Sequence, residues 1–174
     1  ITIATLGNTV DFGDLSINNG YCASVTNSIR GAVTINDAPN YYNTIEYITI
    51  ATTGNSQDFG DLSSARYANT GFSNSTRAIS AGGNTAPTFI SNIDSITIAT
   101  KGNSTNFGSI AAATTYSGAV SSPTRGVIGG GGTPTPLNTI QYISFATEGD
   151  TVDFGDLTQA RNQLRGMSNA HGGL

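Results

Sequence analysis

Large apolar residues alternate with small or polar ones along several short stretches of the chain. In YITIA (residues 47–51) every second side chain is large and apolar, which is the period of a β-strand with two different faces. Three more short strands are predicted downstream, in SQDFGDL (56–62), RYANTGFSNS (66–75) and TRAISAGG (76–83). TTGN (52–55) is predicted as a turn and NTAPTFISN (84–92) as a loop. No segment has the apolar spacing of a long amphipathic helix.

This pattern is written four times. ITIATLGNTVDFGDL returns as ITIATTGNSQDFGDL, ITIATKGNSTNFGSI and ISFATEGDTVDFGDL, with copies beginning at Ile1, Ile48, Ile96 and Ile143. We therefore predict a single repeat domain over residues 1–174, with repeats 1–47, 48–95, 96–142 and 143–174, the last one incomplete.

The repeat length and content predict an all-β fold. Four short strands in about 47 residues, joined by Gly, Pro and Asn turns, match one blade of a β-propeller. A β-helix is the alternative, although its rungs usually recur at shorter intervals. Assigning strands to blades gives three complete blades and a split or truncated fourth, in residues 20–62, 68–110, 115–157, and in 1–15 with 163–174.

The recurring motifs resemble kelch repeats. TRAISAGG and TRGVIGGGG carry an Arg followed by a Gly doublet, NTIEYITIAT and NTIQYISFAT carry the next strand, and DFGDL carries one aromatic residue near the last strand. RGAVTINDAPN, in the first copy, departs from the pattern because it lacks the Gly doublet. More narrowly, the amino-acid sequence of the repeats resembles that of kelch-like repeats in structural and tail-associated proteins of tailed bacteriophages. That resemblance implies a non-enzymatic structural or adhesive virion component, such as a tail fibre, baseplate or capsid appendage.

The recurring apolar residues are predicted to form the core between blades. In a propeller the middle strands are covered on both faces, and the aromatic residue of the DFG segment adds a second layer. The predicted core residues are Ile48, Ile50, Phe59, Ile96, Ile98, Phe107, Ile143, Phe145 and Phe154.

Composition narrows the range of partners. A net charge of −4 with one Lys and six Arg leaves no basic cluster, so nucleic acid is a poor partner. No apolar run is long enough to span a membrane. The single Cys22 excludes an internal disulfide, and we expect it to be buried on a strand. Because the chain begins with Ile rather than Met, we expect a processed protein or a piece of a longer one.

The polar residues give no catalytic constellation, so we expect no enzyme activity, cofactor or metal. Acids flank the Phe-Gly pair in three copies, but copy three has Asn106 and Ser109 there, which favours turn capping over calcium binding. Arg30, Arg77 and Arg125 are expected to pair with an Asp of the neighbouring copy, a carboxylate clamp being the alternative. His171 has no partner at motif spacing.

Two loops carry aromatic residues that could contact a ligand. Tyr41 and Tyr42 lie in APNYYNT, and Phe89 lies in TAPTFIS. These residues support an alternative function, a module that binds cell-surface glycans. Open strand edges support another, a filament or multi-subunit assembly in which the chain is a homo-oligomer. The expected location is the virion, or otherwise the extracellular space or cell surface.

Overall fold

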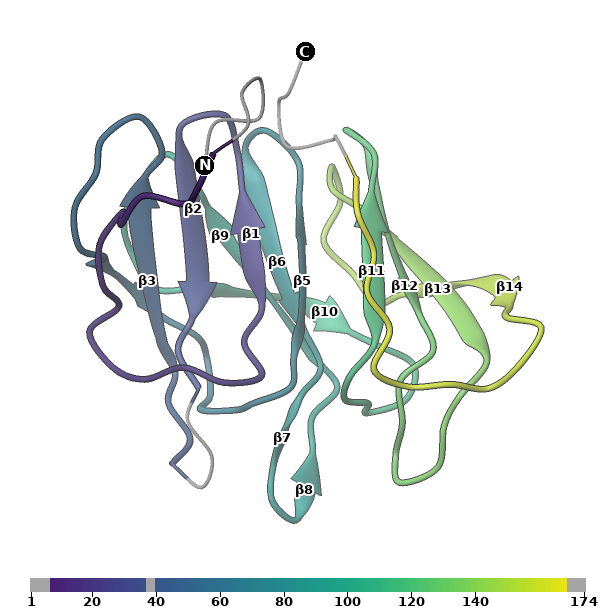
Figure 1. Ribbon diagram of the computed structural model, residues 1–174. Coiled ribbons are helices and arrows are strands. Elements are labelled where there is room, and N and C mark those ends of the chain that lie inside the picture. Colours follow the sequence, from purple (N-terminus) through teal and green to yellow (C-terminus); the bar gives the residue numbers. More distant parts are fainter. Residues whose placement is uncertain (1–6, 37–39, 169–174) are drawn as a thin grey trace.

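The computed structural model describes residues 7–36 and 40–168, and every regular element in them is a β-strand. The all-β prediction is confirmed. Fourteen strands form three four-stranded antiparallel sheets and one two-stranded hairpin (Figure 1).

The first sheet contains β1 (Ser24–Thr26), β2 (Arg30–Thr34), β3 (Thr44–Thr49) and β4 (Gln57–Asp61). The second contains β5 (Thr70–Ser73), β6 (Arg77–Ala81), β9 (Asn92–Thr97) and β10 (Thr105–Ser109). The third contains β11 (Gly118–Ser121), β12 (Arg125–Gly129), β13 (Thr139–Ser144) and β14 (Val152–Asp156).

Each sheet is a simple antiparallel meander whose strands pair in chain order. The predicted loop at 84–92 contains the hairpin of β7 (Asn84–Thr85) and β8 (Thr88–Phe89), which corrects the sequence-based expectation. Two-residue strands are too short to show an alternating pattern, so no hydrophobic periodicity predicted them. Figure 1 shows this hairpin projecting beyond the ends of the three sheets.

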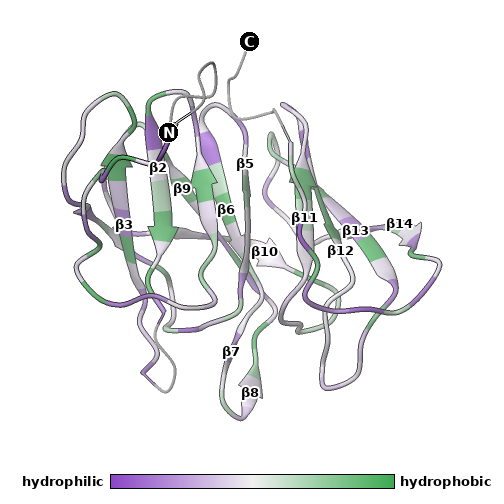
Figure 2. Ribbon diagram, in the orientation of Figure 1, coloured by the Kyte–Doolittle hydropathy of each residue, from purple (hydrophilic) through white to green (hydrophobic). Residues whose placement is uncertain are grey.

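The three sheets stand side by side, with β5 between β1 and β11 (Figure 1). Two apolar clusters fill the space between neighbouring sheets, and Figure 2 shows hydrophobic positions along their strands. The cluster between the first and second sheets includes Ala32, Ile45, Tyr47, Phe59, Ala78, Ile96 and Ile98. The cluster between the second and third includes Phe72, Ile79, Ile93, Phe107, Ile128, Ile143 and Phe145.

The DFG segment of each sheet forms a joint with the next sheet. In the first joint the amides of Gly102 and Ser104 donate to the carbonyls of Phe59 and Asp61, each at 2.8 Å. In the second, the amides of Gly149 and Thr151 donate to the carbonyls of Phe107 and Ser109, at 2.8 and 2.9 Å. A β-bulge on this segment brings its glycine against the neighbouring turn. These two contacts define what we call the sheet-to-sheet joint.

Residues 11–16 form a third joint of this kind, against the first sheet. Gly54 N donates to Phe12 O at 2.8 Å, and Ser56 N donates to Asp14 O at 2.9 Å. At the other end, residues 163–168 follow β11: Leu164 N bonds Tyr116 O at 3.4 Å, and the hydroxyls of Ser121 and Ser168 lie 3.0 Å apart. Both segments therefore contact a sheet in the way that a neighbouring sheet would.

The first copy makes the same turn without its Gly doublet. Ile35 N donates to Thr44 O at 2.9 Å, as Gly82 N does to Asn92 O and Gly130 N does to Thr139 O. The loss of the doublet therefore leaves this backbone bond in place. In the described ranges we find no helix that is long and apolar enough to cross a membrane.

Candidate functional site

Four tyrosines gather at one end of the sheets. The ring of Tyr21 meets those of Tyr67 and Tyr116 edge to face, with centroids 6.2 and 5.8 Å apart. Tyr67 and Tyr116 are also edge to face at 6.4 Å, and Tyr41 stacks on Tyr67 at 5.3 Å. Tyr21 is 59% exposed, so the cluster presents an aromatic surface to solvent.

The backbone places these rings through a conformation that recurs in every repeat. Tyr21, Ala68, Tyr116 and Gln163 all have φ near +56°, a region that residues with a side chain rarely adopt. Ala68 N donates to Tyr21 O at 3.1 Å, and Tyr116 N donates to Ala68 O at 3.0 Å. Backbone hydrogen bonds therefore connect the positive-φ residues of successive repeats. These bonds bring the tyrosines at and beside those positions into one cluster.

The phenol of Tyr116 has a raised pKa in this cluster. Burial raises the pKa of Tyr116, and the neighbouring hydroxyls of Tyr67 and Tyr21 raise it further. Tyr116 therefore stays neutral and can donate a hydrogen bond at neutral pH. An uncharged surface of rings and hydroxyl groups suits a neutral polar ligand better than an ion.

A polar cavity of about 170 Å³ adjoins the tyrosines. Its lining comes from four equivalent segments, one per repeat: residues 22–24, 69–71, 117–119 and 164–166. Tyr21 and Tyr116 directly precede two of these segments in the chain. The cavity lies where the innermost strands of the sheets meet.

The structure brings one of the three predicted surface aromatics into the tyrosine cluster. Tyr41 lies in it, Tyr42 is half-buried beside it in the chain, and Phe89 lies on the β7–β8 hairpin. Sequence reasoning did not identify Tyr21, Tyr67 and Tyr116. Their recurrence before the innermost strand of successive repeats was the available signal, although Tyr67 and Tyr116 are not at equivalent positions.

Most of the predicted core residues lie between two sheets. The buried ones are Phe59, Ile96, Ile98, Phe107, Ile143 and Phe145. All six belong to the two apolar clusters that separate the sheets.

Three predicted core residues are not buried. Ile48 is half-buried. Ile50 is 45% exposed, whereas Ile98, the residue equivalent to Ile50 in the next repeat, is fully buried. Phe154 is 55% exposed, whereas the equivalent Phe107 is 3% exposed. Ile48 and Ile50 lie on the side of the first sheet that faces away from the second sheet. Phe154 lies on the side of the third sheet that faces away from the second sheet. No complete sheet among the described residues covers these three side chains.

The recurring Arg residues contact the next sheet through its backbone. Arg30 Nη1 donates to the carbonyls of Ile98 and Ala99 at 2.9 Å, and Arg77 Nη1 donates to Phe145 O at 2.9 Å. The guanidinium groups of Arg30 and Arg77 also lie over aromatic rings. The expected pairing with an Asp is therefore wrong for these two residues, because carbonyl groups at the strand ends are nearer.

One buried ion pair was missed by sequence reasoning. Arg66 and Asp94 are both fully buried and form a salt bridge across the first joint. Arg66 Nη1 also donates to the carbonyls of Gly82 and Asn92. Burial lowers the pKa of Arg66 and Asp94 opposes that change. Arg161 recurs at the position of Arg66, but the other equivalents of Arg66 are Asn19 and Thr114. Glu46 and Gln141 stand in place of Asp94, so the pair itself does not recur in the sequence.

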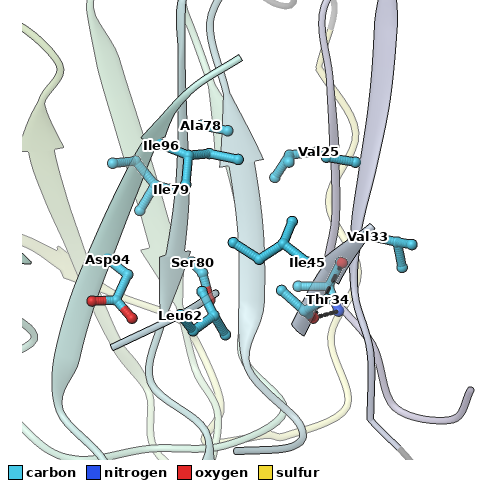
Figure 3. A pocket seen from close by; sticks show the side chains of 12 residues that line it. Val25, Val33, Thr34, Ile45, Leu62, Ala78, Ile79, Ser80, Asp94 and Ile96 are labelled. Carbon is cyan, nitrogen blue, oxygen red and sulfur yellow. Dashed lines mark hydrogen bonds between the residues drawn. The ribbon is translucent and has the colours of Figure 1, made fainter. Parts of the chain in front are cut away.

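The space between the first and second sheets is closed to ligands. It leaves a cavity of about 20 Å³, lined mainly by apolar side chains such as Val25, Ile45, Ile79 and Ile96 (Figure 3). A volume of this size holds a single water molecule at most. The tyrosine cluster and its polar cavity remain the candidate binding site.

The remaining polar candidates form no reactive site in the described part of the chain. Cys22 is an exposed free thiol that lines the polar cavity, which corrects the expectation of burial. Residues 7–36 and 40–168 contain no group of three His, Cys, Asp or Glu that could hold a metal ion. His171 lies outside the described residues, as does the strand predicted at the start of copy one, in residues 1–6.

The chain matches no protein-family model and no curated protein.

Proposed function

We propose that the three sheets are kelch-like blades of a β-propeller and that the protein is a non-enzymatic structural and adhesive component. The observation that carries this proposal is the repeated sheet-to-sheet joint. The residues that recur from copy to copy are those that build it: the glycine of the DFG segment, the Gly-Asn turn (Gly-Asp in the fourth copy) and the apolar strand residues. A sequence that repeats its joints and varies its other surfaces is suited to a scaffold.

The proposed setting is a bacteriophage virion, in a tail fibre, baseplate or capsid appendage. This part rests on the resemblance of the repeats to kelch-like phage proteins. Mass spectrometry of gradient-purified particles from the source should find the protein at stoichiometric levels with other virion proteins. Recovery only from the host cytosol, with particles free of it, would refute the virion assignment.

A second candidate function, glycan binding, is favoured by the tyrosine cluster. Aromatic faces stack on the apolar faces of sugar rings, and hydroxyl groups can bond to the sugar hydroxyls. The rings of Tyr21, Tyr41, Tyr67 and Tyr116 and the adjoining polar cavity offer both kinds of contact.

A glycan array with the full chain tests this candidate. We expect Tyr21→Ala to reduce binding by about 10-fold or more, since it removes the most exposed ring of the cluster. Phe89→Ala is the matched control, because that aromatic lies on the hairpin outside the cluster. No binding above background, or equal losses in both variants, would count against a tyrosine site.

A further inference from the structure

We propose that copies of this chain associate head to tail, with the third sheet of one copy docking on the first sheet of the next. In this contact residues 151–157 of one copy take the place of residues 9–15 of the other. The strand β1 of that other copy takes the place of residues 163–168 beside β11. The inference goes beyond the proposed function, because it concerns two faces of the molecule and is independent of the virion assignment.

The third sheet presents an unfilled half of the joint. Gly60 and Gly108 lie so close to the next sheet that a Cβ would be 2.4 and 2.1 Å from a carbonyl oxygen of its turn. At Gly155, the equivalent glycine on β14, a Cβ would meet nothing within 4 Å. Phe154 is exposed where its equivalents are buried. The outer face of the third sheet therefore has the same construction as the faces around Gly60 and Gly108, each of which contacts the next sheet.

The other half of the joint already holds the same sequence. Residues 9–15 and residues 151–157 both read TVDFGDL. The first sheet binds residues 9–15 through Gly54 N and Ser56 N, and Asn55 Oδ1 accepts a bond from Asp14 N at 3.0 Å. A second copy can therefore offer its TVDFGDL to the same turn with identical chemistry.

Residues 9–15 are the less ordered occupant of that turn. They form no strand in the described structure. Residues 152–156, by contrast, are held as β14 by pairing with β13. A segment already ordered in its bound form loses less conformational entropy on binding. The sheet behind it also covers apolar surface that residues 9–15 leave open.

Both faces carry open apolar surface. A hollow of about 270 Å³ on the first sheet is bordered by Leu15, Val33 and Ile48. A hollow of about 270 Å³ on the third sheet is lined in part by Val120, Val127 and Ile140. The residues equivalent to Ile48 and to Ile140 in the second sheet, Ile96 and Ile93, are buried in joints. Joining the two faces removes both hollows from water.

Charges on the two faces are complementary. Arg161 occupies the position of Arg66 but is exposed, and its side chain bonds only Gln159 among the described residues. Glu46 occupies the position of Asp94 and is buried, with serine donors and no basic partner in the described part of the chain. Docking carries Arg161 of one copy to Glu46 of the next, as Arg66 meets Asp94.

Analytical ultracentrifugation of the full chain tests the contact. We expect the wild-type protein to form species of at least two copies, whereas one copy has a mass of 17.8 kDa. Phe154→Asp disables one face and Ile50→Asp disables the other, so each variant alone should bind itself about 10- to 100-fold more weakly. An equimolar mixture of the two variants keeps one intact pair of faces and should recover a two-copy species.

The control is Val152→Asp, which lies on the same strand and is 54% exposed. Its equivalents Gln57 and Thr105 stay exposed in the existing joints, so this variant should associate like the wild type. If circular dichroism shows that an Asp variant is unfolded, Arg161→Glu is used in its place. Its control is Lys101→Glu, which makes the same charge change at a residue that contacts Tyr47 between the first and second sheets, away from both docking faces. A single-copy wild type at every concentration, or a mixture that stays single-copy, would overturn the proposal.

Discussion

Gly13, Gly60 and Gly108, the glycines of three of the four repeated Phe-Gly pairs, occupy positions where a side chain would collide with a neighbouring turn. Their recurrence in the sequence indicated a tight bend or a close approach, but not which backbone approaches them. For Gly60 and Gly108 the structure identifies the partner as the turn of the next repeat that contains Gly102-Asn103 or Gly149-Asp150, 41 or 42 residues further along the chain. Contacts over such a separation follow from the stacking of sheets, which no local pattern encodes.

Gly108→Ala should therefore destabilise the protein strongly. The new Cβ would lie 2.1 Å from Gly149 O, and φ at Gly108 is +156°. We expect a loss of about 3 kcal/mol in the free energy of unfolding, measured by urea denaturation. Gly149→Ala is the matched control, because it has φ of +154° and open space around its Cβ. Equal losses in both variants would show that backbone strain alone accounts for the effect.

Glu46 should make stability depend on pH in the acid range. Burial raises the pKa of Glu46, but hydrogen bonds from Ser16 and Ser56 outweigh it and leave this pKa below its ordinary value. The stability from these bonds is therefore present above the unfolded-state pKa near 4.5 and lost as pH falls through the lower folded-state pKa. Ser16→Ala should lower stability at neutral pH and move the acid loss to higher pH.

Urea denaturation from neutral pH down to about 3 measures this change. Ser28→Ala, at an exposed serine, is the control and should follow the wild-type curve. Parallel curves for Ser16→Ala and wild type would contradict the role of Glu46.

At the scale of elements, period and turn chemistry predicted the four strands of each sheet, but not how the innermost strands meet. The strands β1, β5 and β11 are linked by side-chain hydroxyls at equivalent positions. Ser73 Oγ donates to Thr26 O at 2.7 Å, and Ser121 Oγ donates to Ser73 O at 2.8 Å. In a chain rich in Ser and Thr, these hydroxyls could not be distinguished from solvent-facing ones by sequence.

Ser73→Ala should cost about 1 kcal/mol, since it removes the donor that links β5 to β1. The residue is buried, so water replaces the lost bond poorly. Ser75→Ala, in the exposed turn that follows, should change the free energy of unfolding by less than about 0.5 kcal/mol. Thermal or urea unfolding of both variants decides whether the hydroxyl contributes as expected.

At the scale of the whole molecule, the second sheet is the one that has a complete sheet on each side among the residues that the structure describes. The recurring residues predicted a core between sheets, and that prediction fails at Ile48, Ile50 and Phe154 because they face outward on the first and third sheets. An internal repeat shows which residues are equivalent, but it does not show which copies lie at the ends. Their surroundings differ although their sequences agree.

This asymmetry predicts a gradient of stability, with the second sheet the last to open. In repeat proteins each unit is stabilised by its neighbours, so a unit with two neighbours opens less readily than one with a single neighbour. Native-state hydrogen exchange should therefore find the amides of β6 and β9 slower than those of β2, β3, β12 and β13. The Phe154→Asp variant is the sample of choice, because association between copies would otherwise protect the outer sheets.

A matched pair of substitutions tests the same gradient at single residues. Ile93→Ala, in the core between two sheets, should cost about 3 kcal/mol, whereas Ile140→Ala, at the equivalent half-buried position of the third sheet, should cost about half as much. Uniform exchange across the three sheets would contradict the gradient and point to a molecule that unfolds as one cooperative unit.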